Sequence, residues 1–247
     1  MASTSLSKTL SHSWNAYRSN ARLVVLSGIS LIIAFLIPVF ASLPTYNDLG
    51  GIFIRTASLY LNLTPLSAAV IVISLFFSLL FLSFAAVIMN IIIKHSRTST
   101  KVRKEVMDAI EKYTGRVFVV LLLYTAVVFV VNAALYSTAY AAAATAIASL
   151  LMAPLVFYAP SSIVMDDNGI IRSMRASARF FFRRLDYFAA WIVIAVVLLT
   201  VIDAVLIPLT GTMVSRYLLL AVSSLFVLPF LMLLQGESYI SRFGLLH

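Results

Sequence analysis

The fold is decided by Val117–Tyr158, which reads VFVVLLLYTAVVFVVNAALYSTAYAAAATAIASLLMAPLVFY and contains no charged residue. A helix needs about 20 mostly apolar residues to cross a bilayer. This run is about twice that length, so we interpret it as two spans joined by a hairpin near Tyr136–Tyr140. Both tyrosines would then lie in the aromatic belt at the membrane interface.

The whole chain shares this apolar character, with 247 residues of which 62% are hydrophobic and 11% charged. Soluble domains average about 45–50% apolar and about 25% charged residues. Composition therefore excludes a water-soluble globule, and high hydrophobicity excludes a disordered chain. The absence of cysteine excludes disulfides, thiol catalysis and cysteine-based metal sites. We expect an all-α polytopic membrane protein with a single integral membrane domain over residues 1–247.

Six stretches are long and apolar enough to span a bilayer. They are Leu23–Leu43, Leu66–Ile93, Val117–Tyr136, Ala141–Tyr158, Phe188–Leu209 and Tyr217–Leu234. The first 20 residues are polar. They therefore do not predict a secretory signal peptide, which needs a short apolar core and a small-residue cleavage site.

The basic residues predict the orientation of the spans. Sixteen of the 18 Lys and Arg residues fall on one side of a six-span topology, and only Arg55 and Arg216 fall on the other. Because positive charge is enriched on the cytoplasmic side, we predict a multi-pass protein of the cell membrane with cytoplasmic N- and C-termini. The net charge of +9 follows from this topology and does not predict nucleic-acid binding.

An amphipathic segment precedes each odd-numbered span. Its apolar residues are spaced i, i+4, i+8 and i+11, which places them on one stripe of a helix. The stripes are Leu6, Leu10, Trp14 and Tyr17; Val102, Val106, Ile110 and Tyr113; and Ile170, Met174, Ala178 and Phe181. We interpret them as interfacial helices in a threefold repeat over residues 5–94, 100–159 and 168–236, the first lengthened by an outer loop at Pro44–Pro65. The alternative is that three amphipathic helices coincide by chance.

The third of these segments is strongly basic. Asp166, Asp167 and Asn168 favour a helix N-terminus at its start. Five arginines follow: Arg172, Arg175, Arg179, Arg183 and Arg184. A helix with an apolar stripe and a basic face lies in the membrane plane, with its cations among anionic headgroups. We therefore predict that these arginines bind membrane lipids; the alternative is that they only set the topology.

The second segment differs because its charges are nearly balanced. Opposite charges recur at i, i+4 in Lys101/Glu105, Lys104/Asp108 and Asp108/Lys112, and such pairs stabilise a helix. This pattern predicts a solvated helix face or a docking surface for a protein partner.

Two features inside the spans are candidate sites. Asp203 is an intramembrane acid, and such residues are functional candidates; it predicts either a proton or cation site or an ion pair with Arg216. Small residues at i+4 spacing allow helices to approach closely, which favours packing within the protein or in a homo-oligomer. These are Ala141, Thr145, Ser149 and Ala153.

Catalytic signatures are absent from the sequence. The chain has no phosphate-binding loop, zinc-protease or nucleophile-elbow motif. Its three His residues, His12, His95 and His247, lie far apart along the chain. We therefore predict no catalytic residue, no cofactor and no metal site.

Residues 160–181, PSSIVMDDNGIIRSMRASARFF, resemble a pattern in a broad prokaryotic group of six-span membrane proteins. That group includes the YciC-like proteins and the membrane domain attached to some glycerophosphodiester phosphodiesterases. In it a proline closes a span, an acidic–glycine turn follows, and an amphipathic helix with a serine, matched here by Ser177, leads into the next span. The sequence has no match to the phosphodiesterase domain, so no catalytic residue is carried over. The resemblance implies a role in envelope or lipid homeostasis or an accessory membrane role.

Three function hypotheses follow. The leading one is a non-enzymatic membrane protein that engages lipid headgroups or a protein partner through its basic interfacial helices. The second is an accessory structural subunit of a larger membrane complex, and the third is a small-solute or ion transporter that uses Asp203.

Overall fold

The structure is a computed structural model that describes residues 6–48, 51–54, 64–96 and 102–241. Its main elements are helices, which confirms the all-α class. They are α1 (Leu6–Ser19), α2 (Ala21–Phe40), α4 (Pro65–Ser96), α5 (Val102–Leu135), α6 (Ala141–Val156), α7 (Ala159–Asp166), α8 (Ile170–Arg183), α9 (Leu185–Val222), the π-helical turn η1 (Ser223–Val227) and α10 (Leu228–Ile240).

Six helical stretches are long and apolar enough to cross a membrane, and each overlaps one predicted span. They are Ala21–Phe40, Pro65–Ser96, Met107–Leu135, Ala141–Asp166, Leu185–Leu206 and Tyr217–Ile240. Large apolar side chains remain exposed on them, including Val72, Leu150 and Val193, as expected where lipid rather than water covers the surface. The chain is therefore a multi-pass integral membrane protein.

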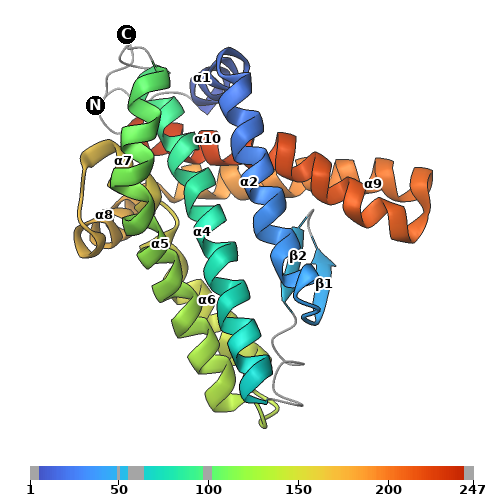
Figure 1. Ribbon diagram of the computed structural model, residues 1–247. Coiled ribbons are helices and arrows are strands. Elements are labelled where there is room, and N and C mark those ends of the chain that lie inside the picture. Colours follow the sequence, from blue (N-terminus) through green and yellow to red (C-terminus); the bar gives the residue numbers. More distant parts are fainter. Residues whose placement is uncertain (1–5, 49–50, 55–63, 97–101, 242–247) are drawn as a thin grey trace.

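Four of these helices, α2, α4, α5 and α6, run alongside one another and pack in that order (Figure 1). The second half of α4 forms the centre of the packing, where Ile88, Met89 and Ile92 are fully buried. Helices α1, α7 and α10 pack around this half of α4. The core therefore lies toward the end of the bundle at the top of Figure 1.

A glycine is required where α2 crosses η1. A Cβ atom at Gly28 would lie 2.9 Å from the Leu225 Cα atom and from the Ser224 carbonyl oxygen. Real Cβ atoms do not approach backbone so closely, so a larger residue would push the two helices apart. Gly28 thereby fixes the distance between the first and last predicted spans.

Helix α9 doubles back on itself, and the resulting hairpin extends sideways from the other spans (Figure 1). The reversal brings Leu199 into a cluster with Val227 and Leu231, and the Trp191 indole donates a hydrogen bond of 2.8 Å to the Leu231 carbonyl. Pro208 lies in the intervening stretch, where its missing N–H weakens the helix. The fifth and sixth predicted spans thus form one hairpin.

The predicted outer loop at residues 44–65 is partly ordered as a β-hairpin. Strand β1 (Thr45–Asp48) pairs with β2 (Gly51–Ile54) in antiparallel register, with Thr45 opposite Ile54. The strands are rich in β-branched and aromatic residues, which favour extended backbone. Residues 49–50 and 55–63 of this loop, including Arg55, lie outside the described residues.

The three predicted amphipathic segments differ in the structure. Helices α1 and α8 are separate from the spans that follow them, with breaks at Asn20 and Arg184. The second segment is not a separate helix, because α5 runs without a break into its span. No helix-breaking residue separates the two parts of α5, since Gly115 alone costs only about 1 kcal/mol within a helix.

The packing of these segments follows a cyclic order. Helix α1 packs on α10, α5 packs on α4, and α8 packs on α6 and α7. Each segment therefore contacts the last helix of another proposed repeat unit. A threefold repeat would produce this order, and the repeat itself stays a prediction.

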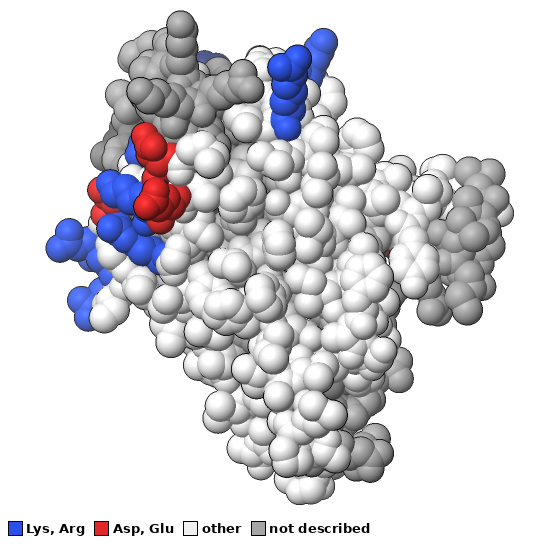
Figure 2. Space-filling view, viewed as in Figure 1, with Lys and Arg blue, Asp and Glu red and all other residues white. Residues whose placement is uncertain are grey.

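Charged side chains gather at the end of the bundle that carries α1 and α8 (Figure 2). The lower part of the view is free of Lys, Arg, Asp and Glu among the residues that are coloured. We call the end that carries α1 and α8 the charged end. It is defined by the described basic residues Lys8, Arg18, Arg22, Lys94, Lys112, Arg116, Arg172, Arg175, Arg179, Arg183 and Arg184.

Candidate functional site

Helix α8 has two opposite faces. Ser173, Ser177 and Phe180 are buried against α6 and α7. Four arginines are solvent-exposed: Arg172, Arg175, Arg179 and Arg183. At about 100° per residue, these arginines lie within one quarter of the helix circumference, about half a turn from Ser177.

The buried face of α8 is displaced from the predicted apolar stripe. Of that stripe, Ile170, Met174 and Ala178 are half-buried and Phe181 is buried, whereas the two serines are fully buried. Helix α1 shows the same displacement, because Thr9 and Ser13 are buried while Trp14 is 51% exposed. The reason is that small side chains allow closer helix contact than the larger apolar residues beside them.

Ser177 repairs a break in the fourth span. Pro160 has no N–H and cannot continue the hydrogen-bonding pattern of α6, so the chain turns between α6 and α7 at Phe157 and Tyr158. The Ser177 hydroxyl donates to the Pro154 carbonyl at 2.7 Å and accepts from the Tyr158 N–H at 2.9 Å. It thereby bridges the two groups that would bond directly in an unbroken helix.

A second group from α10 completes this repair. The Gln235 side-chain amide donates a hydrogen bond to the Phe157 carbonyl. Three backbone groups at the break, the Pro154 and Phe157 carbonyls and the Tyr158 N–H, thus have side-chain partners, as buried backbone groups require. The break is therefore held by side chains of α8 and α10, and the Ser177 contacts fix the orientation of α8.

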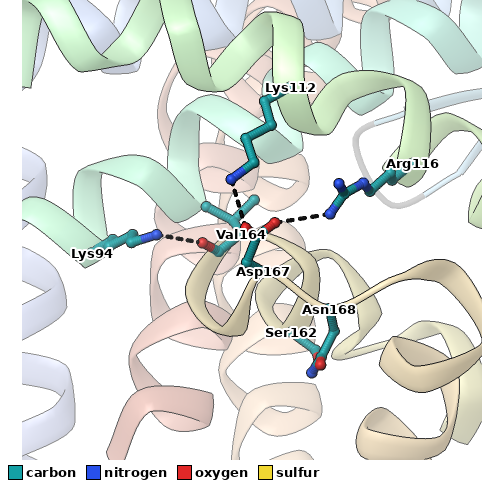
Figure 3. A network of polar contacts seen from close by, with 7 residues as sticks. All are labelled: Lys94, Lys112, Arg116, Ser162, Val164, Asp167 and Asn168. Carbon is teal, nitrogen blue, oxygen red and sulfur yellow. Dashed lines mark hydrogen bonds and ion pairs between the residues drawn. The ribbon is translucent and has the colours of Figure 1, made fainter.

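The turn between α7 and α8 is held by basic residues from α4 and α5 (Figure 3). Lys112 Nζ lies 2.6 Å from Asp167 Oδ2, and Arg116 Nη1 lies 2.8 Å from Asp167 Oδ1. Lys94 Nζ donates to the Val164 carbonyl at 2.8 Å, where a cation also compensates the negative end of the helix dipole. We call this set of contacts the clamp.

Asp167 has the geometry expected of the residue that ends α7. Its φ of 52° and ψ of 34° place it in the left-handed region, which Asp tolerates better than most residues. The hydrogen bonds from Lys112 and Arg116 hold the pKa of its carboxyl below the usual value. The helix start that Asp166, Asp167 and Asn168 predicted is observed, since α8 begins at Ile170, but the N-cap position itself is occupied by Gly169.

Tyr113 lies at the centre of the clamp cations. Its ring centroid is 5.7 Å from Lys94 Nζ, 5.0 Å from Lys112 Nζ and 6.0 Å from Arg116 Cζ. An aromatic face attracts cations within about 6 Å.

The predicted pair Asp108/Lys112 is replaced by a contact between Lys112 and Asp167, and the pairs at residues 101–105 lie outside the described side chains.

Asp166 anchors the same turn to α10. Its carboxylate accepts a hydrogen bond of 2.8 Å from the Tyr239 hydroxyl and one of 3.4 Å from the Asn168 amide. Asn168 also donates to the Ser162 hydroxyl at 2.9 Å. The turn before α8 is therefore fixed from α4, α5, α7 and α10.

The remaining predicted site residues lie apart from the clamp. Arg184 forms a two-point ion pair with Asp186, at 3.2 Å for each contact, and lies 4.1 Å from the centre of the Tyr187 ring. Asp203 is half-buried on α9, and the Arg216 side chain with which it was predicted to pair is outside the described side chains.

The small-residue stripe of α6 is half-buried along its length. Its member Thr145 accepts a hydrogen bond of 3.1 Å from Asn132 of α5 and donates one of 2.7 Å to the Ala141 carbonyl. This stripe therefore contacts α5 at Thr145. The other three members are Ala141, Ser149 and Ala153.

In the part of the chain that the structure describes, no group of three or more His, Asp or Glu residues is arranged to hold a metal ion. No family model, curated protein or solved structure matches the chain. The resemblance of residues 160–181 to the six-span group stays a prediction.

Proposed function

We propose that this is a non-enzymatic membrane protein that binds anionic lipid headgroups through the exposed face of α8. The observation that supports the proposal is that the arginines of this face have no protein partners among the described residues. Four arginines of this face form no hydrogen bond or ion pair with any residue in the described ranges: Arg172, Arg175, Arg179 and Arg183. Cations left without protein partners remain available for an external anion.

The chemistry of arginine suits a phosphate-bearing headgroup. Its guanidinium is planar, stays charged, and can donate two parallel hydrogen bonds to one phosphate. Each basic residue near an anionic leaflet contributes about 1 kcal/mol of attraction. Several on one helix face can therefore retain anionic lipid beside the protein.

The anchoring of α8 supports this role, because it fixes which face points outward. Ser177 is held within the break of the fourth span, and Asp167 holds the preceding turn to α5. A helix fixed at its start and middle cannot rotate its arginines inward. The guanidinium groups are thus presented outward without a cost for ordering the backbone at the moment of binding.

The charge pattern supports a position at the cytoplasmic leaflet. Helix α8 lies at the charged end, and positive residues are enriched on the cytoplasmic side of membrane proteins. That leaflet carries the anionic lipids of the surface potential. We accordingly propose that both termini and α8 lie on the cytoplasmic side of the cell membrane.

The test compares thermal stability of the purified full chain in neutral detergent with and without added phosphatidylglycerol. We expect phosphatidylglycerol to stabilise the wild type, and a variant with all four exposed arginines changed to Gln to lose a measurable part of this stabilisation. A matched variant with the same positions changed to Lys keeps the charge and should retain most of it. Equal stabilisation of the wild type and the Gln variant would contradict the proposal.

The same purification distinguishes lipid binding from a docking role. Native mass spectrometry of the complex extracted from membranes is expected to show retained anionic lipid. A stoichiometric protein partner whose binding is lost in the Gln variant would instead favour an accessory subunit of a larger complex. In that case the arginine face would bind protein rather than lipid.

A further inference from the structure

We propose that a cleft between α4, α5 and α7 is a second binding site, which takes a phosphodiester monoanion. The cleft has a volume of ≈ 200 Å³ and is lined by Lys94, His95, Asp108, Ala109, Lys112 and Tyr113, with Ile91 and Val164 beside them. Ligand pockets for drug-sized molecules measure about 300–1,000 Å³. This smaller volume suits a single headgroup.

Electrostatics favour an anion in the cleft. Lys94, Lys112 and Arg116 lie around one tyrosine ring, so three like charges are held close together. Among the described side chains, Asp108 and Asp167 are the carboxylates beside them, while Asp166 accepts hydrogen bonds from Tyr239 and Asn168. These three cations and two carboxylates of the described residues leave one positive charge, which the single negative charge of a phosphodiester neutralises.

Donor geometry allows direct contact with phosphate oxygens. The Lys112 ammonium carries three N–H donors, and its bond to Asp167 uses one of them. The Lys112 side chain is 48% exposed, so a ligand can reach it without unfolding the clamp. Hydrogen bonds from a cation to phosphate are roughly twice as strong as neutral ones.

The position of the cleft favours a lipid as the source of the phosphodiester. Lys94 lies two residues before the end of the candidate span Pro65–Ser96, and Lys112 lies in the second turn of Met107–Leu135. The cleft therefore opens at the level where spans leave the hydrocarbon and headgroups lie. Ile91, Ala109 and Val164 give it an apolar wall that suits the glycerol and first methylenes of a lipid.

Asp167 competes with such a ligand. Its carboxylate already occupies positions 2.6 Å from Lys112 and 2.8 Å from Arg116, which a phosphate would otherwise approach. Removing this negative charge should therefore strengthen binding, even though it weakens the clamp. A purely structural role for the cluster predicts no such gain.

The experiment is native mass spectrometry of the full chain in neutral detergent, titrated in one arm with phosphatidylglycerol and in the other with soluble glycerophosphoglycerol. Ala109→Phe fills the cleft without changing charge, and Ala109→Ser is its matched control. Lys112→Gln removes one cation, and Asp167→Asn removes the competing carboxylate. A variant with the four exposed α8 arginines changed to Gln separates this site from the one under Proposed function.

We expect Ala109→Phe and Lys112→Gln to weaken the tightest binding step about tenfold. Ala109→Ser and the α8 variant should leave that step unchanged, and Asp167→Asn should strengthen it. If Ala109→Phe and Lys112→Gln weaken binding in the lipid arm alone, the ligand is a membrane lipid. If they weaken binding in both arms, the ligand is a soluble phosphodiester that uses the same site. The proposal would be overturned if Ala109→Phe bound the ligand as tightly as the wild type and had unchanged thermal stability. This holds whether or not the α8 variant changes lipid binding.

Discussion

The first turns of α5 and the whole of α8 use the same kind of charge in opposite ways. In α5, Lys112 and Arg116 both bond to one carboxylate, that of Asp167. In α8, four arginines project outward without a partner among the described residues. A basic amphipathic pattern therefore does not define a role, because the role depends on whether another part of the chain supplies a carboxylate.

The two helices also differ in what holds them. Helix α5 continues directly into a span, so its position follows from packing along its whole length. Helix α8 is short and separate, and its Ser177 hydroxyl supplies two hydrogen bonds to the broken span. Substitutions at Ser177, in the clamp and at the exposed arginines of α8 should therefore differ in their effects on stability.

Loss of the Ser177 hydroxyl, which anchors α8 to the broken fourth span, should have the largest effect on stability. Ser177→Val leaves the buried Tyr158 N–H and the Pro154 carbonyl without their partner, and each such group costs about 1–3 kcal/mol. We expect the free energy of unfolding to fall by about 3 kcal/mol in total, measured by titration with denaturing detergent in mixed micelles. Ser173→Ala is the control, because its hydroxyl bonds only to the Ile170 carbonyl of its own helix. Equal losses for the two variants would remove the special role of Ser177.

Loss of the clamp should have a smaller effect. Asp167→Asn removes both ion pairs, but the Lys112, Arg116 and Asp167 side chains are 48%, 37% and 47% exposed, and exposed pairs contribute little. We expect a modest fall in thermal stability in detergent. We also expect the wild type, unlike the variant, to lose stability as salt is raised, because salt screens exposed charges. A salt response that is identical in both proteins would show that the clamp is not electrostatic.

The clamp should also respond to pH with a definite sign. Because Lys112 and Arg116 lower the pKa of Asp167, the ion pairs stabilise the folded state above the unfolded pKa of about 3.9. This contribution is lost as the pH falls through the lower, folded pKa. The stability difference between wild type and Asp167→Asn should therefore be constant above about pH 5 and shrink in more acidic solution. A difference that persists in acid would point to packing instead.

Loss of the free arginines should have the smallest effect on the protein alone. Changing the four exposed arginines of α8 to Gln alters no protein contact in the described structure. In neutral detergent we expect stability to stay within about 0.5 kcal/mol of wild type, as for ordinary surface substitutions. A larger loss in the absence of anionic lipid would show that these arginines are structural, like Lys112 and Arg116 of α5.

The sequence predicted the class of the fold because hydrophobic length alone determines where a chain can cross a bilayer. All six predicted spans overlap candidate spans of the structure. The predicted limits of the fourth span were too short because Pro160 suggested an end, whereas α7 continues the helix to Asp166 beyond the break. The sideways course of the α9 hairpin could not be predicted, since periodicity holds no information about crossing angles.

The candidate site was predicted only in part. The arginines of α8 were identified from their spacing, and Ser177 was identified through a resemblance that gave it no physical role. The contact between Lys112 and Asp167 was missed because the two residues are 55 positions apart, while Asp108 offered a local partner. The faces of α1 and α8 that pack against the protein were not predicted, because the spacing of apolar residues does not show that small hydroxyl residues such as Ser13 and Ser177 form these contacts.

The most direct test of the lipid-binding face is headgroup cross-linking in nanodiscs. The full chain would be reconstituted with phosphatidylglycerol that carries a photoreactive group on its headgroup, and adducts would be mapped by mass spectrometry. We predict adducts on the exposed face of α8, between Arg172 and Arg183, that decline when high salt screens the charges. Adducts confined to other helices, with α8 unlabelled at low salt, would contradict the account.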